Sequence, residues 1–200
     1  DMLTINSVSY ATSAGIIKQE AAIFDSDVTN SLISNTVRPC GLLKNGDVQS
    51  FLKDRALYIR SKNQRGCMNF DIPGIPYQNG YIVAIDSSFI SGRPLTIAFT
   101  NDTAKHTEVE TQLPELSDWQ TSYVVLPPLA SDGLGYSVYI ANDSVGDFES
   151  ENEIRSIRIY KIPYDELLSL RYVTKSGIDG IASSSGSPIR SGMTDVNFLV

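Results

Sequence analysis

The chain has 200 residues, 42% of them hydrophobic, and a formal net charge of −7. This size allows one large domain with a core that does not depend on a metal or on many disulfides. Lys and Arg are scattered rather than clustered, which excludes a nucleic-acid surface and argues against binding to an anionic membrane. No apolar run reaches the roughly 18 residues that span a bilayer. The chain opens on Asp1 in strand-like alternation and shows no signal peptide, so we expect an excised or processed piece of a longer protein.

Short runs of alternating apolar residues, closed by Pro, Gly or Asn-Asp pairs, recur along most of the chain and predict strands. In order these are Leu3–Tyr10, Ile16–Phe24, Phe51–Arg60, Cys67–Ile72, Tyr81–Ser87, Leu95–Thr100, Thr107–Leu113, Trp119–Leu126, Gly135–Ala141 and Ile154–Ile162. Strict alternation means that one face packs on a core while the other meets solvent or a ligand. We therefore predict an all-β fold, an antiparallel β-sandwich of the jelly-roll or galactose-binding-like type. An immunoglobulin domain is excluded, because it would be shorter and would have its Trp between its two Cys.

Helix is predicted only in short pieces. Pro163–Leu170 has Pro at its first turn and acids inside it, and a single helical turn is expected around Asp47–Leu52. Beyond these strands the chain becomes rich in Ser and Gly, with a final strand expected at Val196–Val200. The predicted organisation is a sandwich domain over residues 1–172 and a tail or linker over residues 173–200.

Cys40 and Cys67 are the two cysteines of the chain. They are predicted either as buried thiols or as one disulfide that closes a loop of about 28 residues and adds on the order of 3 kcal/mol. They do not make a zinc site, because the only histidine, His106, is remote in sequence.

Residues for catalysis are sparse. No G-x-S-x-G elbow is present, and His106 lies in a polar loop, where we expect an exposed side chain. Acids that alternate on strand faces and would suit a jelly-roll glycosidase are Glu108, Glu110, Glu149, Glu151 and Glu153. One tryptophan is few for a sugar-cleaving cleft, so these acids are interpreted as solvated and the chain as non-catalytic.

A calcium site is predicted at Asp25 and Asp27. These carboxylates precede Thr29-Asn30 in what we expect to be a loop after a strand, and such loops supply hard oxygen ligands. The EF-hand spacing is absent, so the predicted calcium is structural.

A ligand site is predicted at the loop end of the sandwich. The polar, turn-rich loops are Asp25–Asn30, Ser88–Arg93, Asn101–Lys105 and Asn142–Asp147. We expect Trp119 to supply a stacking ring and Arg93 and Asn142 to supply hydrogen-bond donors. If Trp119 fills the core instead, this placement fails.

The C-terminal strands resemble a family. The residues that carry the resemblance are Leu113-Pro114, Tyr123–Pro128, Gly135-Tyr136, Asn142–Gly146 and Ile159–Asp165. They are similar to the extracytoplasmic jelly-roll domains of multispanning, glycosyltransferase-like membrane proteins of uncultured bacteria. The resemblance covers residues 80–170 and brings no catalytic residue. It implies a domain outside the membrane, beside transmembrane helices of the same parent protein.

The function expected is that of a non-catalytic, extracytoplasmic carbohydrate-binding or accessory module on the cell surface. Its partner would be a carbohydrate or cell-surface glycan, with no nucleic acid. The alternatives are a structural or assembly protein of the cell surface and a jelly-roll glycoside hydrolase.

Overall fold

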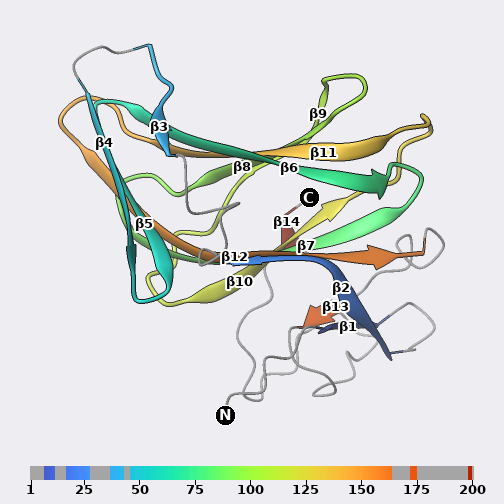
Figure 1. The fold of residues 1–200 in the computed structure, drawn as a ribbon. Coiled ribbons are helices and arrows are strands. Elements are labelled where there is room, and N and C mark those ends of the chain that lie inside the picture. Colours follow the sequence, from blue (N-terminus) through green and yellow to red (C-terminus); the bar gives the residue numbers. More distant parts are fainter. Residues whose placement is uncertain are drawn as a thin grey trace.

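The computed structural model describes residues 7–11, 17–27, 37–42, 46–163, 172–174 and 198–199. These residues form two sheets packed face to face (Figure 1). The strands are β1 (Ser7–Ala11), β2 (Ile17–Asp27), β3 (Arg38–Pro39), β4 (Asp47–Lys53), β5 (Ala56–Lys62), β6 (Arg65–Pro76), β7 (Gly80–Ser91), β8 (Thr96–Asn101), β9 (Thr107–Gln112), β10 (Gln120–Leu126), β11 (Leu134–Asp143), β12 (Glu149–Ile162), β13 (Tyr172–Thr174) and β14 (Phe198–Leu199).

The strand order is that of a jelly roll. Sheet I runs β13-β1-β2-β12-β7-β10-β14, with the β4–β5 hairpin attached to β12, and sheet II runs β3-β6-β11-β8-β9. Of the eight strands β2 and β6–β12, β2, β7, β10 and β12 pair in sheet I and β6, β8, β9 and β11 in sheet II. The chain crosses between the layers as in a pair of Greek keys. Pairing is antiparallel except between β10 and β14. The predicted antiparallel β-sandwich is confirmed.

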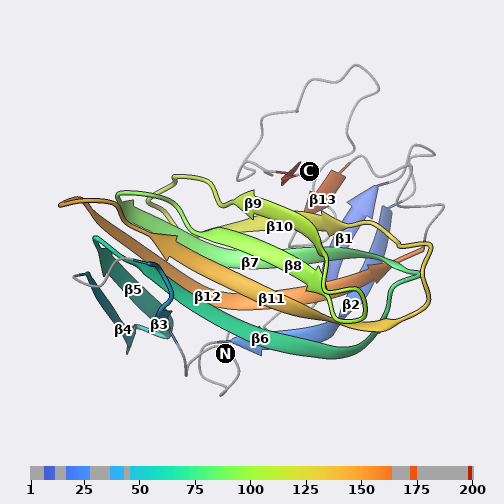
Figure 2. The same cartoon turned by 90° about the horizontal axis from the view of Figure 1, so that it is seen from above.

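The core lies between the sheets because each strand directs every second residue inward. Sheet II contributes the inward residues of β6 and β11, and sheet I contributes those of β5, β7, β10 and β12. The fully buried side chains Met68, Ile72, Tyr81, Phe99 and Tyr136 are among the largest in this core. Figure 1 shows the two layers one above the other, and Figure 2, which looks down on them, shows their elongated outline with β4 and β5 at one end.

Two local expectations are wrong. The segment predicted as one strand at Phe51–Arg60 is a hairpin, because the chain turns at Asp54 and Arg55 with φ angles of 50° and 62°. Two consecutive residues with positive φ form a tight hairpin turn. Such turns usually contain glycine, but here both positions are occupied by other residues. The helical turn expected around Asp47–Leu52 is strand β4.

The C-terminal expectations are only partly covered by the described residues. The helix predicted at Pro163–Leu170 lies outside them after its first residue. β13 crosses the predicted boundary at residue 172 and pairs with β1, while β14 lies within the predicted strand Val196–Val200. The division into a domain and a tail stays a prediction. In the described part of the chain, no helix is long and apolar enough to cross a membrane.

Candidate functional site

The outer face of sheet II is built by the alternation of β6 and β11. Where these strands pair, Asn69 lies beside Tyr139 and Cys67 lies beside Ala141. Arg38 of the short strand β3 lies beside Cys67. The residues between these positions fill the core, so the polar and aromatic side chains are directed outward together.

A hollow of about 490 Å³ opens on this face. Its lining comes from three segments: Arg38 and Cys40 from β3 and the residue after it, Cys67 and Asn69 from β6, and Tyr139 from β11. Arg38, Cys40 and Asn69 are exposed and Tyr139 is half-buried. The hollow therefore presents an aromatic ring, an amide and a guanidinium to solvent.

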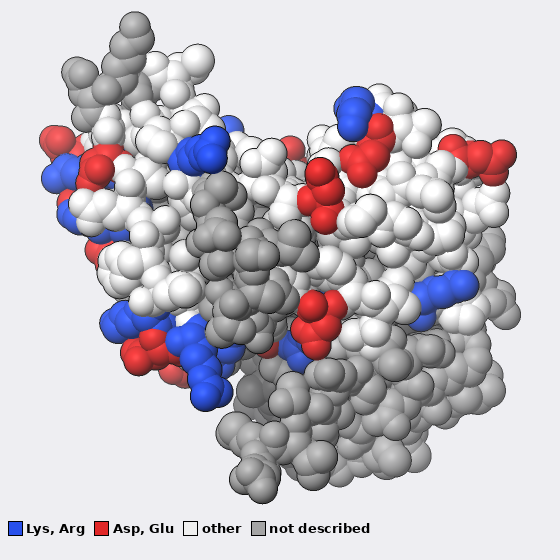
Figure 3. All heavy atoms as spheres, viewed as in Figure 1, with Lys and Arg blue, Asp and Glu red and all other residues white. Residues whose placement is uncertain are grey.

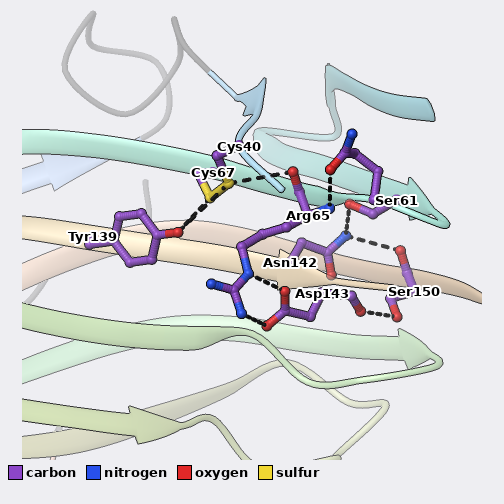
Figure 4. A network of polar contacts seen from close by, with 9 residues as sticks. Cys40, Ser61, Arg65, Cys67, Tyr139, Asn142, Asp143 and Ser150 are labelled. Carbon is purple, nitrogen blue, oxygen red and sulfur yellow. Dashed lines mark hydrogen bonds and ion pairs between the residues drawn. A yellow bond between two sulfur atoms is a disulfide. The ribbon is translucent and has the colours of Figure 1, made fainter. Parts of the chain in front are cut away.

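One wall of the hollow is a disulfide. Cys40 and Cys67 are bonded, with their Cα atoms 5.8 Å apart, and the backbone N–H of Cys40 donates to the carbonyl oxygen of Arg65 at 2.9 Å. The hydroxyl of Tyr139 lies 2.6 Å from the Cys67 sulfur (Figure 4). Because a disulfide sulfur carries no hydrogen, Tyr139 is the donor. This contact fixes the tyrosine ring against the disulfide.

The two arginines near the hollow, Arg65 and Arg38, differ in their ion pairing. At its margin Arg65 donates to both carboxylate oxygens of Asp143, and this hydrogen bonding raises the pKa of the Arg65 guanidinium. Within the described residues, Arg38 has no ion-pair partner. Arg38 is therefore the guanidinium at this site whose donors are available to a ligand.

Removal of the disulfide is expected to destabilise the fold by about 3 kcal/mol, because its cysteines are 27 residues apart and the reduced chain regains loop entropy. The variant is Cys40→Ser with Cys67→Ser, compared with wild type by urea unfolding. Reductant should lower the stability of wild type and leave the variant unchanged. Equal stability of the two proteins without reductant would contradict the bond.

The structure places Trp119 just before β10, half-buried, with the guanidinium carbon of Arg155 3.9 Å from the centroid of its ring. Arg155 thus covers one ring face in a cation–π contact. Trp119 neither fills the core nor offers both faces to a sugar.

Arg93 and Asn142 lie at the same end of the sandwich but do not form an open site. Arg93 is exposed, and its carbonyl oxygen accepts a hydrogen bond from Asn152 Nδ2 at 2.8 Å. The same Nδ2 group donates to Asn142 Oδ1 at 2.9 Å. Asn142 is 0% exposed, so its side chain cannot reach a ligand. The prediction that Asn142 binds a ligand is therefore wrong: its side-chain amide makes hydrogen bonds in the interior of the sandwich.

The predicted calcium ligands lie in a strand. Asp25 and Asp27 belong to β2, which continues to Asp27, and Asp25 pairs with Arg158 of β12. The expected loop therefore does not begin before residue 28. Among the described residues, no group of three or more His, Cys, Asp or Glu side chains is arranged to hold a metal ion. Calcium binding stays a prediction, to be checked by the melting temperature with and without EDTA.

Three of the five acids considered for catalysis, and His106, have structural partners. His106 is exposed, and its Nδ1 lies 3.4 Å from Glu108 Oε1, while Asn101 also donates to Glu108. Glu149 accepts from Arg60 Nε at 2.8 Å, and Glu151 accepts from the hydroxyl of Tyr58. These two acids belong to sheet I, whereas the hollow lies on sheet II.

Sequence reasoning missed Asn69 and Arg38 as candidate site residues. The sequence does contain a signal for Asn69. Cys67, Asn69 and Asp71 alternate with apolar residues, which places all three on the outer face of the sheet. The pairing of β6 with β11, which brings Tyr139 to Asn69, joins residues 70 positions apart and has no local signal.

No protein-family model matches the chain, and no curated protein matches it significantly. Solved structures that resemble it include one described as "CBM4 structure and function" (10% identity, 70% of this chain and 86% of that chain, TM-score 0.47). Another is the second N-terminal cellulose-binding domain of Cellulomonas fimi β-1,4-glucanase C (12% identity, 70% and 98% covered, TM-score 0.42). A third is a carbohydrate-binding module of Cellvibrio mixtus lichenase 5A in complex with cellotriose (13% identity, 70% and 98% covered, TM-score 0.39).

Proposed function

We propose that this chain is a non-catalytic carbohydrate-binding module and that it binds a glycan in the hollow on sheet II. The observation that carries the proposal is the open hollow that combines the Tyr139 ring with the Asn69 amide and the exposed Arg38 guanidinium. A sugar has an apolar C–H face, which can stack on the tyrosine ring. It also has hydroxyl groups, which can accept hydrogen bonds from the amide and guanidinium donors.

Two neighbours of Tyr139 on the outer face of sheet II are small residues. Across the sheet, Tyr139 pairs with Ala98 of β8, and Ala141 is the next outward residue on β11. Both alanines have short side chains, so neither projects over the sheet surface. The phenol ring is held by its hydroxyl at the disulfide, which lowers the entropy cost of ordering it on binding.

The pairing of the acids supports a non-catalytic role. A glycosidase needs a carboxyl group that stays protonated as the general acid. Hydrogen bonds from Arg60 and Lys62 instead lower the pKa of Glu149, the opposite of this requirement. Burial and the hydrogen bond to Glu151 raise the pKa of Tyr58 to about 12, so Glu151 is engaged by a neutral tyrosine at neutral pH.

We also place this module outside the cytoplasm, as an accessory part of a larger membrane-associated protein. The disulfide supports this location, because such bonds persist in oxidising compartments. The parent protein is proposed on the resemblance of residues 80–170 to extracytoplasmic domains of glycosyltransferase-like membrane proteins.

The test is a glycan array followed by calorimetry with the best glycan. Tyr139→Ala is expected to weaken binding about tenfold or more, since it removes the central ring of the site. Tyr139→Phe keeps the ring and should retain most of the affinity. Phe148→Ala is the matched control, because Phe148 is 81% exposed but lies outside the hollow lining.

Equal losses for Tyr139→Ala and Phe148→Ala would place the glycan elsewhere. Absence of binding to every glycan on the array would overturn the module and favour the cell-surface scaffold. Release of reducing sugar from a bound glycan would instead identify a hydrolase.

A further inference from the structure

Strand β4 is an edge strand of sheet I as far as the described residues show. In the described part of the chain it pairs only with β5, over all seven of its residues and without a bulge. Both ribbon views place β4 at the outermost edge of one end of the molecule (Figures 1 and 2). A regular, unpaired edge is a template for another strand.

The side chains of β4 are available for such pairing. Phe51 is 49% exposed and Leu52 is 54% exposed, one on each face of the strand. Asp47 and Lys53 stand at its two ends, and within the described residues neither has an ion-pair partner. Acidic and basic residues lie intermixed on this end of the surface (Figure 3).

The hairpin turn fixes which backbone groups point to the free edge. The turn at Asp54 and Arg55 makes Lys53 and Ala56 its flanking pair. In such a turn the carbonyl of the first flanking residue accepts from the N–H of the second. Hydrogen bonding alternates along an antiparallel strand, so the N–H and C=O groups of Val48, Ser50 and Leu52 point away from β5.

These outward groups are self-complementary. When a second β4 is laid antiparallel about a two-fold axis at Ser50, Ser50 faces its own copy and Val48 faces Leu52 of the other chain. On the opposite face, Gln49 meets Phe51, and Asp47 meets Lys53 at both ends. We propose that β4 is a homodimer interface, at which a second copy of this chain adds to the edge and joins the two sheets.

Charge selects this register over its neighbours. If the second strand slipped by one residue, its backbone N–H and C=O groups would no longer meet their hydrogen-bond partners. Its side chains would also move to the opposite face of the sheet. A shift that moves the axis to Phe51 places Lys53 opposite Gln49, and a shift to Gln49 places Asp47 opposite Phe51. Only the axis at Ser50 uses every residue of the strand and neutralises both ends.

The interface is tested by analytical ultracentrifugation of the chain over about 1–100 µM, a range typical of weak interfaces. Wild type is expected to form a species of twice the 21.9 kDa chain mass. Asp47→Lys and Lys53→Asp each set like charges opposite one another at both ends, and each should raise the dimer dissociation constant at least about tenfold.

A mixture of the two variants is the decisive sample. Asp47→Lys presents two lysines and Lys53→Asp presents two aspartates, so a heterodimer restores both opposite-charge pairs. Dimers in the mixture but not in either variant alone would support the register. A monomeric wild type, or a dimer indifferent to both substitutions, would overturn it.

Cross-linking gives a second readout. Cα atoms of a directly opposed, hydrogen-bonded pair lie about 5.5 Å apart, a separation that a disulfide spans. Ser50→Cys is therefore expected to form a covalent dimer under mild oxidation. Gln49→Cys, which would face Phe51, is the matched control. Equal cross-linking of both variants would contradict the axis at Ser50.

Discussion

Asn142→Ala is expected to lower the free energy of unfolding by about 3–5 kcal/mol. The Asn142 amide nitrogen lies 3.0 Å from the Ser150 carbonyl oxygen, 3.1 Å from Ser61 Oγ and 3.3 Å from the Ile59 carbonyl oxygen. Figure 4 shows this amide between Ser61 and Ser150. Alanine at this position removes the amide donor that these three oxygens share, so the buried oxygens lose a hydrogen bond. It also leaves a small void.

Urea unfolding of the purified chain measures this loss. Asn69→Ala is the matched control, because Asn69 lies on the neighbouring strand but is exposed, and its substitution should change stability by no more than about 0.5 kcal/mol. In glycan binding the ranking should reverse, with Asn69→Ala weakening affinity. An Asn142→Ala protein as stable as Asn69→Ala would show that the buried network does not stabilise the sandwich.

Arg158→Ala is expected to cost about 3–5 kcal/mol, because it leaves a buried carboxylate without its guanidinium. Arg158 Nη2 lies 2.6 Å from Asp86 Oδ2, and the two side chains are 6% and 11% exposed. Asp86 also accepts hydrogen bonds from Ser156 at 2.8 Å and from Thr121.

Arg60→Ala is the comparison for Arg158→Ala. Arg60 pairs with Glu149 on the same sheet, but these side chains are 32% and 27% exposed, so we expect a much smaller loss of stability than for Arg158→Ala. Arg158→Met combined with Asp86→Leu removes both buried charges and should be more stable than Arg158→Ala. If the double variant is the least stable of the set, the loss of the Arg158 guanidinium from buried Asp86 is not the cause.

The alternation of single strands was readable from the sequence. Leu95–Thr100 and Gly135–Ala141 were each predicted within one residue of the observed start and two of the observed end. The prediction failed at Asp54-Arg55, because these residues adopt positive φ angles without the glycine that usually announces such a turn. There the alternation of β4 and β5 merges into one apparent strand.

The candidate site was harder to predict for a different reason. Asn142 belongs to an Asn-Asp-Ser segment that looks like an exposed loop, yet β11 continues through it and directs its side chain inward. Trp119 was expected to be open to a sugar, but Arg155, from a distant strand, lies over its ring. Burial of a polar residue depends on what packs against it, and the local sequence does not contain that information.

The fold class of this protein could be predicted from the sequence, because the period of apolar residues and the turn residues between them are local properties. The hollow follows from the tertiary structure, because it needs β3, β6 and β11 side by side and the pairing of Cys40 with Cys67 that forms its wall. The tertiary structure also makes β4 an edge strand among the described residues. These features depend on contacts between residues far apart in the chain, whose energies are set by sheet pairing and not by composition.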